Sequence, residues 1–525
     1  MSQNNVPAQA AMPDPNRTWD LVVVGGGITG AGVLNEASRR GLKAVLIDQG
    51  DFGAGTSSKS SKMIHGGLRY LSQGQFGLIR EAAREREKLL SEIPGLVSPL
   101  VYAFAHVRGQ FPPQFLFRLV LLIYDLIGGR KTRRFFKKSD LAFLLPRFFH
   151  HKIKGASCYE DAVTEDSRLV MRTLMEARAS GGEAFNYIKA ISFEKGADGS
   201  IGGLVCVNQL TMEEFTIRGT SFVNSTGAWA DVLRMELGHG AVVRPLRGSH
   251  IVIPSRVFPI SYSMTFFHPQ DGRPIYVFPW YGQTVIGTTD LDHEDGLKGR
   301  VRISQEEVDY LLEGLRSIAP PDAVKETDIL STFSGIRLVI RRGHGRDPSK
   351  EKRTHSVYQD HNLITVTGGK LTTFRAMALE VVDLVAKSLP KTQPPSKPFF
   401  VKYAATHPLP LDKAVCQRLQ DYYGPTYPHL KDGNEVEWEQ IEGSPLYWSE
   451  IRHMLRYERV VHLDDLMLRR TRLGLTQPKG GAKLLDRVGA LCRDELGWSQ
   501  EYWRQEVDRY LRLWMDQHGL PGVSP

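Results

Sequence analysis

The stretch that decides the fold is DLVVVGGGITGAGVLNEASRRGLKAVLID, residues 20–48. Its first part, LVVVGG, contains an uninterrupted apolar run that predicts a buried strand. The next part, GAGVLNEASRRG, has helical spacing, and KAVLID predicts a second buried strand. A strand, a glycine-rich turn, a helix and a second strand in this order are typical of a nucleotide-binding unit.

Three glycines and one acid give this unit its chemistry. Gly25, Gly27 and Gly30 form the pattern GxGxxG between the first strand and the helix, and Asp48 ends the second strand. Glycine at these positions lets the backbone approach a pyrophosphate, which then lies at the N-terminus of the helix. Asp48 can accept hydrogen bonds from both hydroxyls of a ribose, and its charge repels a 2′-phosphate. The pattern predicts a bound dinucleotide, and a glycine-rich turn in an unrelated sheet is the alternative.

The glycine pattern alone does not distinguish FAD from NAD, but two features of the sequence favour FAD. The second strand leads into a loop rich in Ser, Gly and Lys that can wrap around a flavin. A second GxGxxG unit, which would hold a nicotinamide cofactor beside the flavin, is missing from the sequence. The electrons of a reduced flavin must therefore go to a different kind of acceptor.

Length and composition set the broad class. The chain has 525 residues, more than one hydrophobic core usually fills, so two or three domains are expected. Hydrophobic residues make up 41% and charged residues 24%, which places the chain among soluble globular proteins. The four cysteines lie far apart without a CxxC pair, which argues against a metal site and indicates a reducing compartment. Residues 1–18 lack the features of a secretory signal and are predicted to be a disordered tail.

Strand-like and helical runs fill the rest of the chain. Strands are predicted at IGGLVCV, SFVNSTG, HIVIP, PIYVFPW and QTVIGTTD, and helices at 78–91 and 305–318. This mixture predicts an α/β (α+β) fold in which a Rossmann-like FAD-binding domain carries an inserted mixed or antiparallel substrate sheet. Proline and lysine concentrate at 389–398, as in linkers, and the following chain is mostly helical. The predicted units are a catalytic region at 19–390 and a helical C-terminal domain at 400–525.

A second stretch, GTSSKSSKMIHGGLRYLSQG at residues 55–74, is too polar for a core element. Together with DLVVVGGGITGAG, NSTGAW, RGSHIVIP, VIGTTD, SGIR, TVTGGKLTTFR and LRRTRLGL it forms an ordered set of motifs across roughly residues 19–475. This set closely resembles the FAD-dependent, quinone-linked glycerol-3-phosphate dehydrogenases. SSKMIHGGLRYL is highly specific, and GGKLTTFR adds independent weight.

The resemblance implies a site for a small phosphorylated polyol, whose dianion needs cationic donors. A solvated surface charge is the ordinary alternative for a single Arg or Lys, but the implied positions fall within the motifs. The side chains implied at the substrate are Arg69, Tyr70, Arg337, Arg353 and Lys370.

Oxidation of a C2 hydroxyl moves a hydride to the flavin while a base takes the hydroxyl proton, and histidine suits the role of base. His250 in RGSHIVIP and His65 in MIHGG are the two candidates. The family pattern favours His250 at the substrate, with Arg337 and Lys370 as the other catalytic residues, and His65 as a residue that holds the loop or the flavin. A structural histidine is the alternative at each position.

The resemblance also implies contacts to the flavin or its phosphates. Gly66 and Gly67 are expected where the backbone runs close to the isoalloxazine ring. The remaining residues implied at the cofactor are Thr56, Ser57, Ser58, Ser61, His65, Thr226, Gly227, Gly368, Gly369, Leu371 and Thr372. Because these segments contain no cysteine, a cysteinyl flavin is not expected.

The chain departs from the family at one place. The family usually reads GIRPL or GVRPL, whereas this chain reads GIRLVIRRGHGRDPSKEKRTH. Leu338 replaces the proline, which frees the backbone just after Arg337. The insert that follows is basic, so the alignment of Arg353 and the substrate preference stay open.

Positive charge is concentrated in one segment. Between Arg130 and Lys154 there are nine Lys or Arg and a single acid, Asp140, so most of the net charge of +9 lies there. Such a patch indicates an anionic partner, and each cation near a lipid headgroup contributes roughly 1 kcal/mol. The aromatic residues expected among these cations at a lipid interface are Phe135, Phe136, Phe148 and Phe149. A buried helix with a solvated basic rim is the alternative, and no nucleic-acid-binding fold accompanies the patch.

The apolar run at 114–129 precedes this segment and is too short for a transmembrane helix, which needs about 20 apolar residues. The sequence thus predicts a cytoplasmic enzyme attached peripherally to the inner face of the cytoplasmic membrane. Its partners would be glycerol 3-phosphate, a membrane quinone and anionic lipid, without nucleic acid, and a homodimer is left open. Two alternatives remain: an oxygen-using flavin oxidase of a related hydroxy substrate, and a catalytically disabled membrane flavoprotein that serves as sensor or scaffold.

Overall fold

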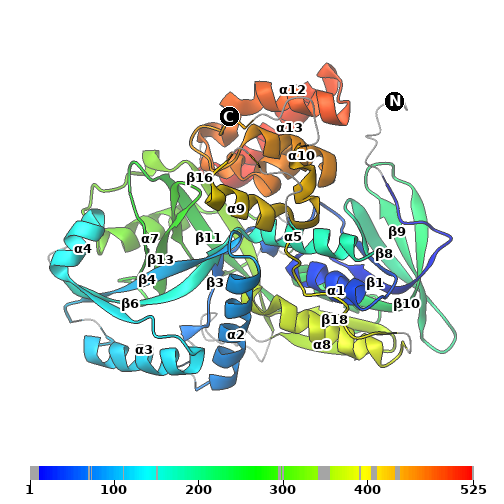
Figure 1. Cartoon of the computed structure of the whole chain (residues 1–525), viewed down its shortest axis with the longest axis horizontal. Helices are drawn as coiled ribbons and strands as arrows, with labels where there is room; N and C mark the ends of the chain where they lie inside the picture. Colours follow the sequence, from blue (N-terminus) through cyan, green and yellow to red (C-terminus); the bar gives the residue numbers. More distant parts are fainter. Residues whose placement is uncertain are drawn as a thin grey trace.

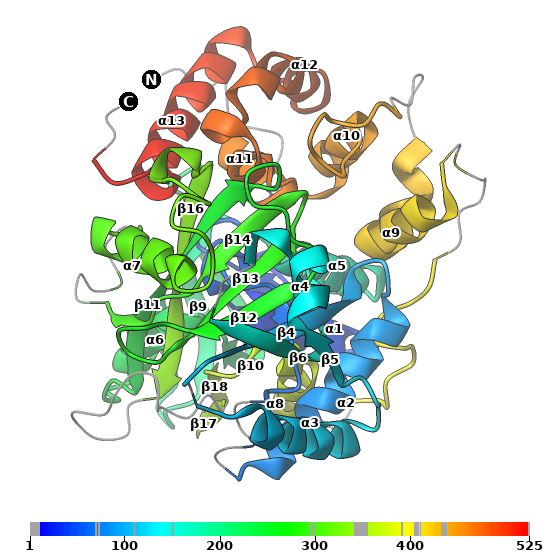
Figure 2. The same ribbon diagram turned by 90° about the vertical axis from the view of Figure 1, so that its left-hand side faces the viewer.

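The computed structural model places two sheets beside each other and a layer of helices from the C-terminal part of the chain over both (Figure 1 and Figure 2). The described residues are 11–68, 71, 74–109, 111–148, 152–293, 297, 301–340, 355–389, 392–403, 409, 411–431 and 438–522.

The first sheet contains the nucleotide-binding unit. Strands β18, β10, β1, β2 and β7 run parallel in this order, and β17, β9 and β8 extend the sheet antiparallel. Their bounds are β1 (Thr18–Val24), β2 (Ala44–Ile47), β7 (Glu183–Phe185), β8 (Ile188–Lys195), β9 (Ile201–Asn208), β10 (Glu214–Asn224), β17 (Ser356–Asp360) and β18 (Leu363–Thr367). The central strands β1 and β2 are almost wholly buried, as expected for parallel strands covered on both faces.

The second sheet is antiparallel except where β12 pairs with β4. Its strands are β3 (Met63–Ile64), β4 (Val97–Val107), β5 (Arg134–Lys137), β6 (Ile153–Thr164), β11 (Val243–Pro254), β12 (Ser263–Phe267), β13 (Pro274–Trp280), β14 (Gln283–Gly287), β15 (Leu291–Asp292) and β16 (Ser331–Ile340). The two sheets confirm the predicted parallel nucleotide-binding sheet with an inserted, mainly antiparallel sheet.

Helices cover the first sheet and flank the second. Helix α1 (Ile28–Arg39) lies between α5 (Asp166–Ala179) and α8 (Phe374–Ala386), which explains why it is buried on nearly every side. The helices beside the second sheet are α2 (Phe76–Glu92), α3 (Gln114–Gly128), α4 (Lys138–Leu144) and α7 (Gln305–Arg316), and the short α6 (Ala230–Met235) follows β10. Ser304 and Glu307 form a capping box that fixes the start of α7.

The C-terminal part is helical, as predicted. Its helices are α9 (Lys413–Tyr423), α10 (Trp448–Tyr457), α11 (Leu473–Thr476), α12 (Leu485–Leu496) and α13 (Gln500–His518). The motif LDDLMLRRTRLGL forms a π-helical turn at Asp465–Arg470, and Arg472, just before α11, lies in the left-handed region at φ 63°. The linker before this part runs along α1, where Asn35 donates to the Phe399 carbonyl.

The predicted tail at 1–18 lies partly outside the described residues. Met12 packs against the first sheet, and Arg17 stacks on Trp19 and pairs with Glu183. Strand β1 already begins at Thr18.

The basic segment differs from its prediction in two respects. Phe148 is buried against Phe258, so the expectation that it contacts lipid is wrong, while Phe135 and Phe136 are half-buried and Phe149 lies outside the described residues. Two cations of the segment pair with acids from other elements, namely Arg130 with Glu87 and Glu160, and Arg133 with Asp125. A count along the sequence overlooks these acids and overstates the local charge.

Helix α3 accounts for the apolar run at 114–129. Its exposed face carries Phe115, Leu119 and Leu126, and its opposite face buries Phe117 and Leu121. Within the described part of the chain, no helix combines the length and the apolar character needed to cross a membrane.

Candidate active site

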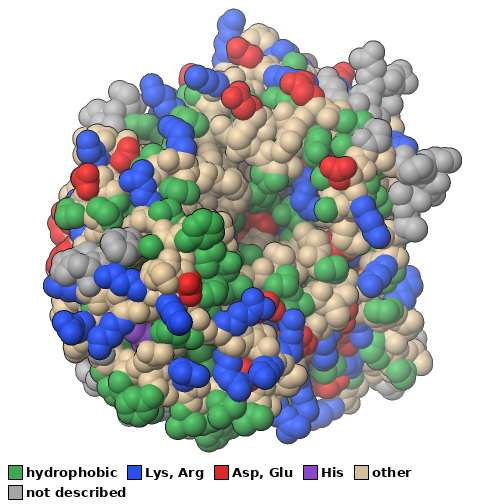
Figure 3. Space-filling model, turned by 60° about the vertical axis from the view of Figure 1, so that its left-hand side comes forward, with side chains coloured by type: hydrophobic (Ala, Val, Ile, Leu, Met, Phe, Trp, Pro, Cys, Tyr) green, Lys and Arg blue, Asp and Glu red, His purple; other side chains and the backbone are tan. Residues whose placement is uncertain are grey.

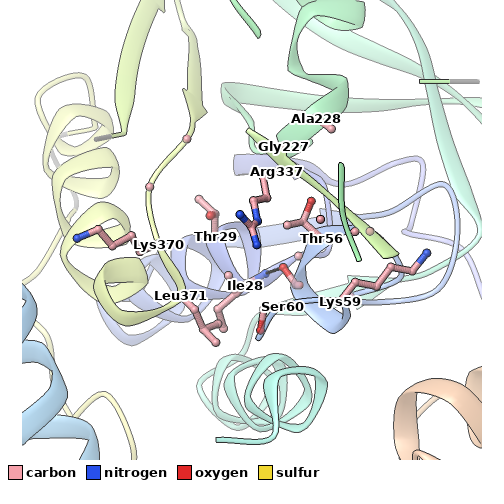
Figure 4. Close-up of a pocket in the computed structure, with 18 of the residues that line it drawn as sticks. Ile28, Thr29, Thr56, Lys59, Ser60, Gly227, Ala228, Arg337, Lys370 and Leu371 are labelled. Carbon is pink, nitrogen blue, oxygen red and sulfur yellow. Dashed lines mark hydrogen bonds between the residues drawn. The ribbon is translucent and has the colours of Figure 1, made fainter. Parts of the chain in front are cut away.

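A cavity of about 1260 Å³ lies between the two sheets. The first sheet contributes the ends of β1 and β10, the start of α1 and the loop that follows β2, and the second contributes β11, β13, β16 and the segment that follows β14. Figure 4 shows part of this lining. Pockets for drug-sized ligands usually measure about 300–1,000 Å³, so this cavity has room for a larger ligand.

Asp48 fixes the glycine turn at one end of the cavity. Its carboxylate accepts hydrogen bonds from the backbone N–H of Gly26 at 2.6 Å and of Gly50 at 2.9 Å. Burial raises the pKa of Asp48 to about 6. The hydroxyl of Ser57 accepts a hydrogen bond from the N–H of Ile28 at 3.0 Å, and a loop residue thereby fixes the first turn of α1.

Gly30 lets α1 lie directly on the turn. A Cβ at this position would overlap the carbonyl oxygen of Gly25 and come within 2.6 Å of Ser225 Oγ. Gly25 and Gly27 line the cavity, whereas Gly30 packs against the Gly25 carbonyl on the side of the turn that faces α1. Such close packing of helix and turn is what a pyrophosphate-binding unit requires, so these residues fit the dinucleotide of FAD.

Most of the predicted cofactor residues line this cavity. Those that do are Gly25, Gly27, Asp48, Thr56, Ser57, Ser61, His65, Gly67, Thr226, Gly227, Gly368, Gly369, Leu371 and Thr372. Ser58 is buried behind the lining, and Gly66 packs against Tyr124 while its N–H donates to Asp161. No group of His, Cys, Asp or Glu in the described ranges is arranged to hold a metal ion.

Arg337 of β16 points into the cavity among residues of the first sheet (Figure 4). Its Nη2 donates to the hydroxyl of Thr288 at 2.7 Å, and its Nη1 lies 3.5 Å from Asp290 Oδ1. A side chain at Gly248 would come within 2.9 Å of Nη2, so the absence of one leaves room for the guanidinium group.

A second arginine, Arg273, lines the cavity and was not anticipated from the sequence. Its Nη2 lies 3.1 Å from Asp290 Oδ2, and its Nη1 donates to the Asp290 carbonyl at 3.0 Å. The buried Asp290 carboxylate therefore turns one oxygen toward Arg273 and the other toward Arg337. Two guanidinium groups held on one carboxylate are suited to bind a dianion such as a phosphate group. Asp290 ends the motif VIGTTD, which was the available signal.

His250 of β11 lies in the wall of the same cavity. Its Nε2 and the hydroxyl of Ser61 share a hydrogen bond of 2.8 Å, and its ring stacks on Phe333 with 4.4 Å between the ring centroids. Burial, followed by the charges of Arg337 and Lys62, holds the pKa of His250 well below its usual 6.5. The imidazole is therefore neutral near pH 7 and can accept a proton.

Gly287 makes the position of the His250 ring possible. The two residues face each other across the antiparallel pair of β11 and β14. A Cβ at Gly287 would overlap the His250 ring, so a larger residue here would displace the imidazole.

The other predicted substrate residues, and His65 as the second candidate for the base, are placed only in part. Lys370 and His65 line the cavity, but the ammonium group of Lys370 points away from Arg337 in Figure 4. The backbone N–H of His65 donates to Thr372 Oγ1 at 3.1 Å. Arg69, Tyr70 and Arg353 lie outside the described residues.

Aromatic side chains form another wall of the cavity. Tyr102, Tyr159 and Tyr276 line it, and the first two stack with 5.4 Å between their ring centroids. They come from three strands, β4, β6 and β13, and no local motif joins them. Sequence patterns therefore gave no signal for this wall.

Two family profiles match the sequence. The family described as FAD dependent oxidoreductase matches residues 20–384. The family described as C-terminal domain of alpha-glycerophosphate oxidase matches residues 373–502. The two matches together reach from the nucleotide-binding unit to α13.

Two individual relatives match nearly the whole chain, and a third matches about 70% of it. The aerobic glycerol-3-phosphate dehydrogenase of Staphylococcus aureus strain USA300 is 32% identical over 544 aligned residues, which cover 97% of each protein. The solved structure of the glycerol-3-phosphate dehydrogenase from Bacillus halodurans complexed with FAD is similar with a TM-score of 0.75, 24% identity and 97% coverage of both chains. The dithionite-reduced L-alpha-glycerophosphate oxidase from Mycoplasma pneumoniae with FAD bound has a TM-score of 0.56 and 17% identity over 70% of this chain and 95% of the other.

Proposed function

The chain belongs to the FAD-dependent oxidoreductases and, among them, to the family of aerobic glycerol-3-phosphate dehydrogenases, and from this premise we propose that it oxidises sn-glycerol 3-phosphate to dihydroxyacetone phosphate and passes the electrons to a membrane quinone. One observation carries the proposal. Arg337 and Arg273 share the carboxylate of Asp290 in the same cavity that holds the neutral His250 and the glycine turn.

Different residues of the cavity bind the cofactor, bind the phosphate group and accept the proton. Gly25, Gly27, Asp48 and Ser57 would hold the cofactor, and bound FAD supplies the acceptor for the hydride of the C2 carbon. Arg337 and Arg273 bind the phosphate group and orient the substrate. His250 takes the proton of the C2 hydroxyl as the C–H bond breaks.

The net reaction removes two electrons and two protons from the alcohol, and the quinone that takes them up leaves as quinol. Anaerobic addition of glycerol 3-phosphate should bleach the absorbance of the oxidised flavin. An unbleached spectrum at saturating substrate would refute the proposal and favour a sensor or scaffold.

The fold likeness to the L-alpha-glycerophosphate oxidase supports oxygen as a second candidate acceptor. Stopped-flow mixing of the substrate-reduced enzyme with a quinone analogue, or with air-saturated buffer, separates the two. Fast reoxidation by the quinone analogue and slow reoxidation by oxygen are expected. The reverse order of rates would identify an oxidase.

Replacement of Arg337 by Ala should mainly weaken recognition of the phosphate group. A lost charged hydrogen bond costs about 1.5–3 kcal/mol, so KM for glycerol 3-phosphate should rise roughly 10- to 150-fold while kcat changes less. Steady-state kinetics with a soluble dye acceptor measure both constants. Arg244→Ala is the matched control, because Arg244 lies on the neighbouring strand β11 outside the cavity lining. A lower kcat with unchanged KM would contradict the assigned role.

Membrane attachment is the second part of the proposal, and α3 supplies its apolar component. Phe115 and Leu126 of α3 are 76% and 74% exposed, and Phe143 after the basic strand is 84% exposed. Figure 3 shows hydrophobic side chains along the lower edge of this face, with Lys and Arg beside them. Exposed aromatic and aliphatic groups beside cations favour binding to an anionic lipid surface.

The exposed cations that are suitable for a test are Lys131, Arg134, Lys137 and Arg147. Their replacement by Ser should release the protein from phosphatidylglycerol vesicles in a sedimentation assay, and added salt should weaken binding of the unchanged protein. Activity with membrane quinone should fall, whereas activity with a soluble dye should persist.

Four exposed cations of the C-terminal part serve as the control, namely Lys413, Lys483, Arg504 and Arg512. The same replacement there should leave sedimentation unchanged. Full sedimentation of the first variant, or release of the control variant, would place the lipid-binding surface elsewhere.

A further inference from the structure

The segment Thr56–Lys62, here called the Ser/Lys loop, connects the two halves of the cavity. Near its start, Ser57 accepts the hydrogen bond from Ile28 at the first turn of α1. Near its end, Ser61 shares a hydrogen bond with the imidazole of His250. The conformation of this loop therefore sets both the dinucleotide turn and the base.

Asp166 at the start of α5 fixes the Ser/Lys loop through hydrogen bonds to Ser60. Its carboxylate is fully buried and accepts hydrogen bonds from the N–H of Ser60 at 3.0 Å and from its hydroxyl at 2.7 Å. The ammonium group of Lys62 lies 3.2 Å from the same carboxylate. Burial alone would raise the pKa of Asp166, but Lys62 and Arg472 hold it below its usual range, so the carboxylate is charged.

Arg472 reaches this cluster from the C-terminal part. Its Nη2 donates to the Ser58 carbonyl at 2.9 Å and pairs with Asp166. Its Nε donates to Glu165 at 2.6 Å, and its Nη1 donates to the Leu468 carbonyl at 2.8 Å. One buried guanidinium group thus binds the loop directly, binds the carboxylate that holds the loop, and remains tied to its own helix.

The backbone of Arg472 supports this reading independently. Its φ of 63° lies in the left-handed region, which a residue with a side chain rarely adopts. It follows the π-helical turn Asp465–Arg470, a form of helix that is often found at functional sites. Both features aim the side chain at the loop and cost conformational free energy, which the contacts with the loop offset.

We infer that Arg472 is a positioning residue: together with Asp166 it clamps the Ser/Lys loop, so that the C-terminal part completes the FAD site without touching the reacting atoms. This inference depends on FAD binding and is independent of the substrate and of the electron acceptor. A purely structural role, in which Arg472 only neutralises buried carboxylates, is the competing explanation.

The test replaces Arg472 by Lys, which keeps the charge but cannot reach all four partners. The matched control is Arg168→Lys, since Arg168 is equally buried and joins α5 to the C-terminal part through hydrogen bonds that go to Glu458 and not to the loop. Both variants should lose thermal stability to a similar degree. Only Arg472→Lys should raise the dissociation constant of FAD at least tenfold in titrations of apoprotein followed by flavin fluorescence, with Arg168→Lys within threefold of the unchanged protein.

A second readout omits the cofactor. In apoprotein, the amides of the Ser/Lys loop should exchange hydrogen at least tenfold faster in Arg472→Lys than in Arg168→Lys. If Arg472→Lys does not fold, Ser60→Ala decides, because it removes one bond between the loop and Asp166 and should also speed this exchange. FAD binding within threefold of the unchanged protein in Arg472→Lys, equal loss in both arginine variants, or unchanged exchange in Ser60→Ala would overturn the inference. None of these results depends on whether glycerol 3-phosphate is the substrate.

Discussion

Replacement of His250 by Ala should slow reduction of the flavin by saturating glycerol 3-phosphate by a factor of about 10²–10⁴, the usual contribution of a positioned base. The expectation follows from a neutral imidazole that lines the cavity beside Arg337 and shares a hydrogen bond with Ser61. Anaerobic stopped-flow measurement of the absorbance of the oxidised flavin gives the rate directly without the acceptor step. Binding of FAD should persist.

The same residue predicts the pH dependence. Burial and two neighbouring cations depress the pKa of His250, so its neutral, active form persists well below pH 6.5 and the acid limb of the reduction rate should lie below that value. The unfolded chain binds a proton on this histidine near pH 6.5 and the folded chain does not, so folding stability falls as the pH drops below 6.5.

His106→Ala is the control, because His106 is also buried in the second sheet but bonds to Ser157 outside the cavity lining. It should leave the reduction rate nearly unchanged. Reduction of His250→Ala at the unchanged rate would show that the base lies elsewhere, and His65, which also lines the cavity, would be the next candidate.

Replacement of Gly30 by Ala should abolish most FAD binding. The added Cβ would overlap the Gly25 carbonyl and crowd Ser225, so α1 must move away from the turn that holds the pyrophosphate. We expect the dissociation constant of FAD to rise at least about 100-fold, equivalent to about 2.7 kcal/mol. Titration of apoprotein with FAD, followed by quenching of flavin fluorescence, measures it.

Gly77→Ala is the matched control, since Gly77 is an exposed residue of α2 with open space where the Cβ would lie. It should bind FAD normally and lose no helix stability, because Ala is the better helix former. Normal FAD content in Gly30→Ala would mean that the helix can shift without loss of the site.

The sequence predicted those parts of the fold whose signals are local. The unit at 20–48 forms β1, α1 and β2, because an apolar strand, a glycine turn and a helical pattern each specify their own geometry. The helices predicted at 78–91 and 305–318 correspond to α2 and α7 for the same reason. Motifs such as VIGTTD and GGKLTTFR likewise marked segments that line the cavity.

The sequence could not predict features that depend on which segments meet in space. Arg273 lies just before β13 and Asp290 lies shortly after β14. Only the antiparallel pairing of these two strands brings the residues together. In the sequence, Phe148 has the pattern of an exposed aromatic residue in a basic run. In the structure it packs against Phe258 and is buried. The charge of Arg133 is likewise balanced by Asp125 of α3, so a sum along the chain misjudges the surface.

The contact between Arg472 and Asp166 also has a consequence for the order of synthesis. The two residues are 306 positions apart, a length that a ribosome translates in roughly 15–60 s. During that interval the emerging chain already contains the complete glycine turn, but the Ser/Lys loop still lacks its contact with Arg472. Because the inferred role of Arg472 requires its contact with this cluster, we expect tight FAD binding only after Arg472 has been translated, and a nascent chain that stalls earlier should leave the ribosome as apoprotein.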